Sequence, residues 1–211
     1  MQSADPFPAS EFDQWAESYD ADVVTYDPFP FAGYEQVLDA VVEMAGAEAG
    51  MSVLDLGAGT GNLAMRFSAL GCRLWCTDYS PSMLEKARPK LPAARLILHD
   101  LRDPFPPQLN RRFDRIVSAY TFHHFELDQK AALTSRLARE HTVPGGSVTL
   151  ADISFPSARE MREFAASIGD AWNEEPYWLA DEALAALRQA GLNAAYRQIS
   201  PCAGVFRVDC D

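Results

Sequence analysis

The sequence predicts an α/β fold in which a seven-stranded, mostly parallel sheet ends in an antiparallel hairpin and carries helices on both faces. From residue 51 onward, short apolar runs rich in β-forming residues alternate with segments of helical periodicity, a pattern typical of a parallel sheet covered on both sides. The last two β-rich runs are joined only by Ser200-Pro201-Cys202-Ala203. Because a parallel crossover needs about a dozen residues or more, these two runs should pair antiparallel.

The 211 residues are enough for one hydrophobic core and too few for two, so we expect a single domain over 1–211. Its parts are an N-terminal helical cover (1–48), a central core (51–153), a helical insertion (154–178) and a C-terminal helix with the hairpin (179–211). The expected strands are 52–56, 72–77, 95–99, 113–119, 147–153, 194–199 and 204–209.

Start and stop signals place helices between these strands. One run of helical periodicity reaches Gly71, which can form a left-handed C-terminal cap. Ser80 followed by Pro81 is typical of a capping residue and a first helical position. Asp128 is expected to open a further helix, and Pro144-Gly145-Gly146 to end it.

The two segments outside the alternation each carry an amphipathic stripe, and we expect both stripes to pack on the sheet. The first stripe comprises Val37, Leu38, Val41, Val42 and Ala45, and the second comprises Met161, Phe164, Ala165, Ile168 and Trp172.

Composition excludes several classes of partner. A formal net charge of −12 would repel a phosphate backbone, so we expect no nucleic acid and favour a small or uncharged molecule as the partner. The four cysteines lack the paired spacing of zinc sites, and no metal is expected. No apolar run is long enough for a membrane span, so we expect no membrane association and a cytoplasmic protein, either monomeric or homodimeric.

The strongest motif is the run Val53-Leu54-Asp55-Leu56-Gly57-Ala58-Gly59-Thr60-Gly61-Asn62, a strand that enters a glycine turn and then a helix. Glycines suit a tight turn that approaches a ligand without Cβ atoms in the way. The spacing is GxGxG, whereas dinucleotide-binding turns are GxGxxG. Asn62 stands where the third dinucleotide glycine would be, which disfavours a nicotinamide-dependent oxidoreductase.

Acidic residues end the next two strands, with Asp78 in Cys76-Thr77-Asp78-Tyr79-Ser80 and Asp100 in Leu98-His99-Asp100-Leu101. With the glycine turn, they make residues 51–153 resemble the class I S-adenosylmethionine-dependent methyltransferases, which implies a Rossmann-like fold. The resemblance implies that Asp78 binds both ribose hydroxyls and that Asp100 and the Leu101 amide bind adenine. It implies S-adenosylmethionine as cofactor, S-adenosylhomocysteine as product, and the cofactor-binding residues Tyr19, Asp55, Gly57, Ala58, Gly59, Gly61, Asn62, Asp78, Tyr79, Met83, Asp100, Leu101 and Tyr120.

Two further segments resemble a small group of uncharacterised bacterial methyltransferases. One is Phe12-Asp13-Gln14-Trp15-Ala16-Glu17-Ser18-Tyr19-Asp20, ahead of the glycine loop, and the other is Tyr120-Thr121-Phe122-His123-His124-Phe125, after the fourth strand. This similarity spans nearly the whole chain and implies methyl transfer without implying a substrate.

On the reaction side, His123 and His124 follow the fourth strand, and Asp152 ends the fifth. Neutral imidazole is a suitable general base near pH 7, and Asp152 could orient a histidine or an acceptor. Adjacent residues at a strand end point apart, so at most one histidine should face the acceptor. A purely structural role for both histidines stays open.

Aromatic residues of the two outer segments could roof the pocket, where their faces would attract a cationic sulfonium. The candidates are Trp15, Tyr19, Tyr26, Trp172, Tyr177 and Trp178, of which Tyr19 is favoured by the resemblance. We therefore expect a methyltransferase acting on O, N, S or C of a small molecule, with both outer segments forming a lid. A sensor or partner subunit that binds the cofactor without methyl transfer is the alternative.

Overall fold

Eight strands form one sheet in the computed structural model, which describes residues 8–25 and 29–211. Along the sheet the described strands follow the order β3-β2-β1-β4-β5-β8-β7, and β6 pairs with the end of β5. All pairs are parallel except those of β8 with β5 and with β7. The bounds are β1 Ser52–Leu56, β2 Arg73–Asp78, β3 Arg95–Leu98, β4 Phe113–Ala119, β5 Thr142–Phe155, β6 Trp178–Leu179, β7 Asn193–Gln198 and β8 Ala203–Asp209.

The predicted fold class is confirmed, including the terminal antiparallel hairpin. Two details differ. The strand β6 was missed because its two residues are too few to show a periodicity. The strand β5 starts at Thr142 rather than at 147, so Pro144-Gly145-Gly146 lies inside it. A register shift between Phe113 and Arg115 of β4 accommodates this irregular start, as a β-bulge does.

Capping residues define the ends of the helices that follow the strands. The Ser80 hydroxyl accepts a hydrogen bond from the Met83 amide, so Ser80 caps α5 as predicted. Gly71, at φ +80°, ends the turn after α4 as predicted. The expected start at Asp128 is wrong by two positions, because Glu126 forms a reciprocal capping box with Gln129. These helices are α4 Asn62–Ala69, α5 Pro81–Lys90, α6 Leu127–Arg136 and α8 Ala180–Gln189.

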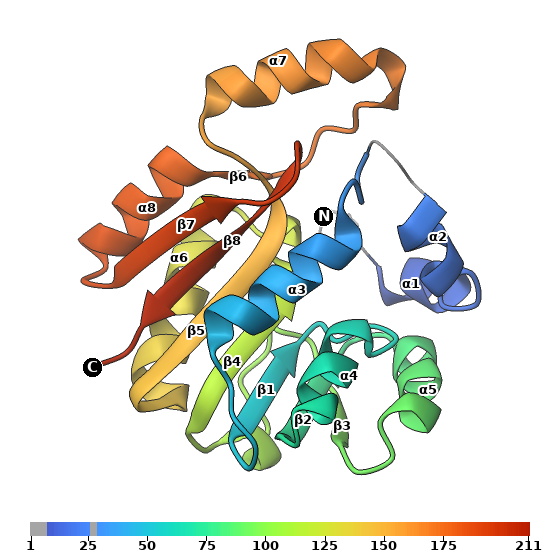
Figure 1. Cartoon of the computed structure of the whole chain (residues 1–211), viewed down its shortest axis with the longest axis vertical. Coiled ribbons are helices and arrows are strands. Elements are labelled where there is room, and N and C mark those ends of the chain that lie inside the picture. Colours follow the sequence, from blue (N-terminus) through green and yellow to red (C-terminus); the bar gives the residue numbers. More distant parts are fainter. Residues whose placement is uncertain (1–7, 26–28) are drawn as a thin grey trace, which may run out of the picture.

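Alternating side chains of the strands feed two hydrophobic cores, one on each face of the sheet. Val53 joins one core and its neighbour Leu54 the other. On the first face lie α4 and α3 (Tyr34–Ala45), and on the second face lie α6 and α8 (Figure 1). Burial on both faces explains why the strands have continuous apolar runs.

The two outer stripes have different positions. Helix α3 packs on β4, β5 and β8, as predicted. Helix α7 (Ala158–Ile168) has no buried residue and lies above the end of the sheet (Figure 1), so its stripe packs on the end of β5 rather than on the face of the sheet. Its Phe164 contacts Phe155 of β5 and also Phe29, with ring centroids 5.5 and 6.0 Å apart. The long β5 carries the chain past the sheet before α7 begins.

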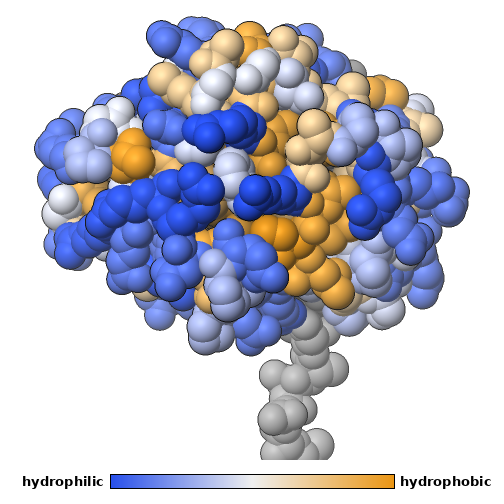
Figure 2. Space-filling model, turned by 90° about the horizontal axis from the view of Figure 1, so that it is seen from below, coloured by the Kyte–Doolittle hydropathy of each residue, from blue (hydrophilic) through white to orange (hydrophobic). Residues whose placement is uncertain are grey.

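Two short helices, α1 (Ala9–Trp15) and α2 (Tyr19–Thr25), lie at the same end of the sheet as α7 but on the side of α4 and α5 (Figure 1). The face of the molecule seen from below is mostly hydrophilic, with a smaller hydrophobic area near its middle (Figure 2). Among the described residues, no helix has the length and apolar character needed to cross a membrane.

Candidate functional site

A cavity of about 900 Å³ opens at the carboxyl ends of the parallel strands. Its floor comes from the loop after β1, the residues that follow β2, β3 and β4, and Ile153 of β5. In open α/β sheets ligands bind at this edge, because the strand order reverses there and leaves a crevice. The helices α1 and α2 and the segment 171–177 supply the other walls.

The glycine loop reaches the cavity through Gly57 and Gly59, whose φ angles of +65° and +55° lie in the left-handed region. A Cβ on Gly57 would lie 2.2 Å from the Thr121 hydroxyl oxygen, so that position must be glycine for packing reasons. A Cβ on Gly59 would meet nothing within 4 Å. Gly59 therefore leaves open space that a ligand can fill next to its backbone.

Asp78 lines the cavity and is held by the loop that it faces. Its two oxygens accept hydrogen bonds from the backbone amides of Gly59 (2.8 Å) and Ser80 (2.9 Å). Burial raises the Asp78 pKa to about 6 despite these hydrogen bonds. Each oxygen still has acceptor capacity, because a carboxylate has about four acceptor positions. The side chain can therefore accept two further hydrogen bonds.

Asp100 and Leu101 also line the cavity, beyond the end of β3. The Arg102 guanidinium binds both oxygens of Asp100, with N–O distances of 2.6–3.0 Å. Partial burial acts to raise the pKa of Asp100, but the hydrogen bonds from Arg102 outweigh it and hold that pKa below its usual value. Sequence reasoning missed Arg102, although its place two residues after Asp100 could have indicated the pair.

Aromatic and sulfur-containing side chains complete the wall between the glycine loop and α5. Tyr79 and Met83 line the cavity, and the Tyr79 ring lies 5.4 Å from that of Phe12. Tyr120, at φ +54°, is a non-glycine residue in the left-handed region, and its ring stacks on Tyr34 at 5.5 Å. Tyr19 faces the cavity from α2. These residues of the predicted cofactor site are thus brought together.

Four other predicted residues, within the glycine loop or next to it, do not line the large cavity. Asp55, Ala58 and Asn62 line a small separate hollow, and Gly61 packs against Leu91. Neither Asp55 oxygen makes a hydrogen bond of normal geometry within the described chain, and burial together with the nearby charge of Asp78 raises its pKa well above the usual value. From these positions they support the loop backbone, and direct contacts with the cofactor stay a prediction.

The N-terminal motif that ends in Tyr19-Asp20 attaches its helices to the loops of the site. Asp20 accepts hydrogen bonds from the Thr60 hydroxyl (2.5 Å) and the Asn62 amide (3.0 Å), and it pairs with Lys90 (2.5 Å). Asp13 accepts from the Ser80 hydroxyl at 2.6 Å. The two carboxylates thus hold α1 and α2 over the loops that follow β1 and β2, which explains why this motif accompanies the glycine loop.

His123 and Asp152 form a dyad on the opposite wall. The His123 Nδ1 atom lies 2.6 Å from Asp152 Oδ1, and the His123 amide donates to Asp152 Oδ2 at 2.8 Å. Asp152 is fully buried, so it contacts His123 and cannot reach an acceptor in the cavity. Because a carboxylate only accepts, the shared proton belongs to Nδ1, and Nε2 of the neutral ring is an acceptor.

The charges around His123 set its protonation. Burial acts to lower the His123 pKa, but the charge and hydrogen bond of Asp152, with the charge of Glu175, outweigh it and raise that pKa. Burial acts to raise the Asp152 pKa, but His123 and Lys130 hold it below its usual value. These pKa directions follow from the position of the imidazole between two carboxylates, Asp152 and Glu175.

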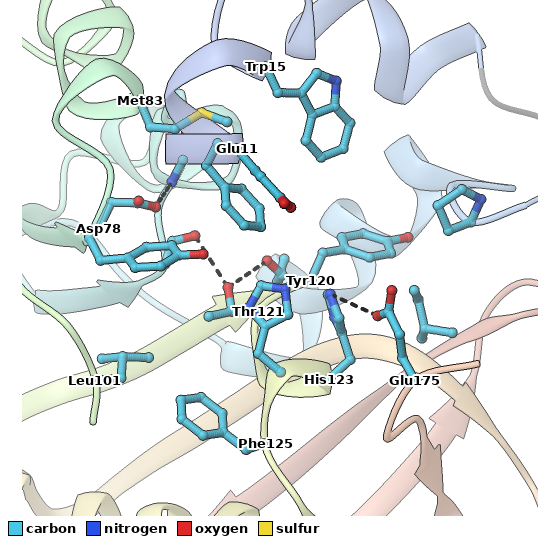
Figure 3. Close-up of a pocket in the computed structure, with 18 of the residues that line it drawn as sticks. Glu11, Trp15, Asp78, Met83, Leu101, Tyr120, Thr121, His123, Phe125 and Glu175 are labelled. Atoms are coloured by element: carbon cyan, nitrogen blue, oxygen red, sulfur yellow. Dashed lines mark hydrogen bonds and ion pairs between the residues drawn. The ribbon is translucent and has the colours of Figure 1, made fainter. Parts of the chain in front are cut away.

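Glu175 and Lys130 are functional candidates that the sequence did not reveal. Glu175 Oε2 lies 3.7 Å from His123 Nε2, and the two side chains face each other across the cavity wall (Figure 3). Lys130 is buried beneath them, where its ammonium donates to the Pro176 carbonyl and lies 5.0 Å from the centre of the Trp178 ring. Burial lowers its pKa to about 8. No periodicity or motif links 130 or 175 to 123, because only the fold makes them neighbours.

His124 also lines the cavity, and that at most one histidine faces the acceptor stays a prediction. The pair lies on a short 3-10 helix, Phe122–His124, rather than on the strand, and this turn keeps both rings on one side. Their centroids are 4.3 Å apart, and His124 contacts Phe12 edge-on at 5.4 Å.

The predicted aromatic roof divides into two groups. Trp15, Tyr19 and Tyr177 line the cavity. Trp172 stacks on Phe29 at 5.4 Å without lining the cavity, and Trp178 is buried in the core on the other face of the sheet. Tyr26 lies outside the described residues.

Comparisons with known proteins identify the family. Residues 53–146 match the model of a methyltransferase domain. An uncharacterized methyltransferase of Geobacillus kaustophilus is 36% identical over 179 residues, which cover 81% of this chain and 77% of that protein. An uncharacterized methyltransferase of Bacillus subtilis, YrrT, is 31% identical over 176 residues, covering 81% and 78%.

Solved structures show the same fold. The DhpI–SAM–HEP complex superposes with a TM-score of 0.74 at 22% identity, covering 94% of both chains. The magnesium protoporphyrin IX methyltransferase of Synechocystis PCC 6803 with bound SAM has a TM-score of 0.69 at 17% identity and covers both chains fully. With its glycine loop, its acidic strand ends and these relatives, the chain belongs to the class I S-adenosylmethionine-dependent methyltransferases.

Proposed function

We propose that this methyltransferase acts on a small-molecule acceptor, with His123 as the general base and Asp152 as the residue that positions it. The observation that carries the proposal is the buried His123–Asp152 pair, whose free Nε2 faces a cavity that the glycine loop also lines. When bound, S-adenosylmethionine supplies a methyl group on a positively charged sulfur. Methyl transfer needs a base only when the acceptor must lose a proton, and a positioned imidazole serves this role near neutral pH.

The residues present fit that cofactor. Gly59 leaves its backbone open on the cavity side, and Asp78 has acceptor capacity for two vicinal hydroxyls. We assign Gly57, Gly59 and Tyr19 to the methionine end, Asp78 to the ribose, and Asp100, Leu101, Tyr79 and Met83 to the adenine. Tyr120 lies between these cofactor-binding residues and His123. With both ligands bound, the walls would hold the acceptor in line with the methyl group and limit the access of water, which supplies much of the rate acceleration in such displacements.

The volume and charge of the site support a small acceptor. About 900 Å³ leaves room for a second small molecule beside the cofactor, whereas a nucleic acid would meet a chain of net charge −12. The His123–Asp152 dyad also favours an enzyme over a protein that only binds the cofactor, because a sensor needs no general base.

The test is transfer of labelled methyl from S-adenosylmethionine to a small-molecule metabolite extract. We expect a labelled product with the wild-type protein and at least a hundredfold lower rate with His123→Asn, since general bases contribute about 10²–10⁴ in rate. Both proteins should bind S-adenosylhomocysteine equally. Equal turnover by His123→Asn would remove the assigned base, and tight cofactor binding without any labelled small molecule would contradict the proposed acceptor class.

A further inference from the structure

Beside the cavity, neutral His123 and ionised Glu175 present two hydrogen-bond acceptors, His123 Nε2 and Glu175 Oε2, while the other oxygen of Glu175 accepts from Asn173 Nδ2 at 2.6 Å. His123 Nε2 and Glu175 Oε2 lie 3.7 Å apart, too far for a hydrogen bond with each other. The only ring proton of neutral His123 is on Nδ1, where Asp152 holds it, and a carboxylate has none. A ligand atom at ordinary hydrogen-bond distance from both acceptors would need two hydrogens to satisfy them.

This requirement separates the possible acceptor groups. A hydroxyl or a thiol carries one hydrogen, so it would leave either His123 Nε2 or Glu175 Oε2 without a donor, whereas Glu175 Oε1 keeps its hydrogen bond from Asn173. An unsatisfied buried acceptor costs about 1–3 kcal/mol, and more when it is charged. An ammonium group carries three hydrogens and can donate to both at once. Its charge also matches the Glu175 carboxylate, and charge-assisted hydrogen bonds are about twice as strong as neutral ones.

The charges that line the cavity favour the same group. Glu11, Asp78, Asp100 and Glu175 all line it, and Glu11 points into it (Figure 3). Among the described lining residues, Arg102 is the only one with a guanidinium or ammonium group, and it is paired with Asp100. A carboxylate or phosphate near Glu175 would therefore find repulsion, whereas a cation would be attracted.

Aromatic rings supply the rest of this compartment. Phe29, Phe31, Tyr120 and Tyr177 line the cavity, and the Phe29 and Tyr177 rings meet edge to face with centroids 6.0 Å apart. Ring faces attract ammonium groups and pack against apolar carbon skeletons. The compartment thus combines a carboxylate for a charge with apolar walls for the body that carries it.

We propose that the methyl acceptor is a primary amine on an apolar or aromatic body, bound with its nitrogen between His123 Nε2 and Glu175. This inference rests on the proposed function and narrows its acceptor to nitrogen. The amine enters as R–NH₃⁺ and gives one proton to His123 Nε2, while Glu175 holds a remaining N–H. The freed lone pair forms the N–CH₃ bond as the carbon–sulfur bond breaks, leaving a neutral thioether and R–NH₂–CH₃⁺. His123 then releases its proton to water.

Lys130 holds the segment that carries Glu175. Its buried ammonium donates to the carbonyl of Pro176, the residue next to Glu175. Tyr177 donates to the Asn173 carbonyl at 2.8 Å and closes the same segment on itself. These bonds fix the carboxylate opposite His123 before any ligand arrives, so little ordering is needed on binding.

The deciding experiment identifies the atom that receives the label in the metabolite extract. We expect the labelled product to be retained on a cation-exchange resin at neutral pH and to resist mild base, with mass-spectrometric fragmentation placing the methyl group on nitrogen. A methyl ester, ether or thioether as the main product would overturn the amine while leaving the small-molecule methyltransferase intact. Absence of any labelled small molecule would overturn the proposed function and the amine together.

Glu175→Gln and Glu174→Gln form a matched pair that tests the carboxylate. Glu174 is the exposed neighbour, so its variant controls for the loss of one negative charge in the same segment. With the labelled acceptor purified, Glu175→Gln should raise KM at least tenfold, and Glu174→Gln should leave it within twofold. Both variants should bind S-adenosylhomocysteine like the wild type. An unchanged KM in a folded Glu175→Gln protein would remove Glu175 from amine recognition.

Discussion

The pH dependence of cofactor binding follows from the raised pKa of Asp78. If both ribose hydroxyls donate to Asp78, binding requires the ionised carboxylate, and protonation below a pKa of about 6 competes with it. Affinity for S-adenosylhomocysteine should therefore be constant above pH 7 and fall about tenfold, or about 1.4 kcal/mol, near pH 5. The amino and carboxyl groups of the ligand keep their charges over this range, so the change reports on the protein.

The substitution Asp78→Asn removes this titration. The variant should bind S-adenosylhomocysteine at least tenfold more weakly at pH 7.5 and show a flat affinity between pH 5 and 7.5 in isothermal calorimetry. Asp103→Asn, at an exposed position near the cavity, is the control that keeps both the affinity and its pH dependence. Wild-type affinity that does not change between pH 5 and 7.5, or tight binding by folded Asp78→Asn, would refute the assignment of Asp78 to the ribose.

The contribution of Asp78 to folding stability falls as the pH rises, whereas the affinity for S-adenosylhomocysteine increases. A carboxyl whose pKa rises from 3.8 to about 6 on folding contributes stability that is fully present below pH 3.8 and is lost as the pH rises through 6. The loss is roughly 3 kcal/mol for a shift of about two pH units. Asp78→Asn removes this cost but turns an amide N–H toward a backbone N–H, which costs about 1–3 kcal/mol. The two nearly cancel, so the variant should stay folded at pH 7.5.

Three further predictions concern the loop, the dyad and the cover. Gly59→Val should weaken S-adenosylhomocysteine binding at least tenfold in calorimetry, because the valine side chain would enter the cavity. Gly145→Val is the control: it should lower Tm through the same backbone strain and leave the affinity unchanged. In NMR titrations the His123 pKa should lie above its usual value, and Asp152→Asn should lower it, since only Glu175 would then oppose Lys130 and burial. An unshifted pKa in folded Asp152→Asn would contradict the dyad. Bound S-adenosylhomocysteine should slow tryptic cleavage at Arg159 and Arg162, because α7 has no buried residue of its own, and unchanged cleavage would count against a lid.

Local signals were sufficient to place the residues of the proposed cofactor half of the site. The glycine loop, the strand ends and their acidic residues are properties of short segments, so residues 53–62, Asp78 and Asp100 could be placed from the sequence alone. The parallel topology follows from the alternation of elements, and the hairpin from a connection too short to cross over. The sequence likewise determined the family, because these features recur at fixed places along the chain.

Only the tertiary structure decided the acceptor half. His123 and Asp152 are 29 residues apart, and Glu175 reaches His123 from a segment beyond α7, so no periodicity connects them. The same holds for Lys130, a residue usually found on the surface, which the fold buries beneath the dyad. The sequence by itself determined where the glycine loop lies, because backbone turns are local. What faces the loop across the cavity depends on long-range packing, which brings an imidazole and two carboxylates together only in the folded chain.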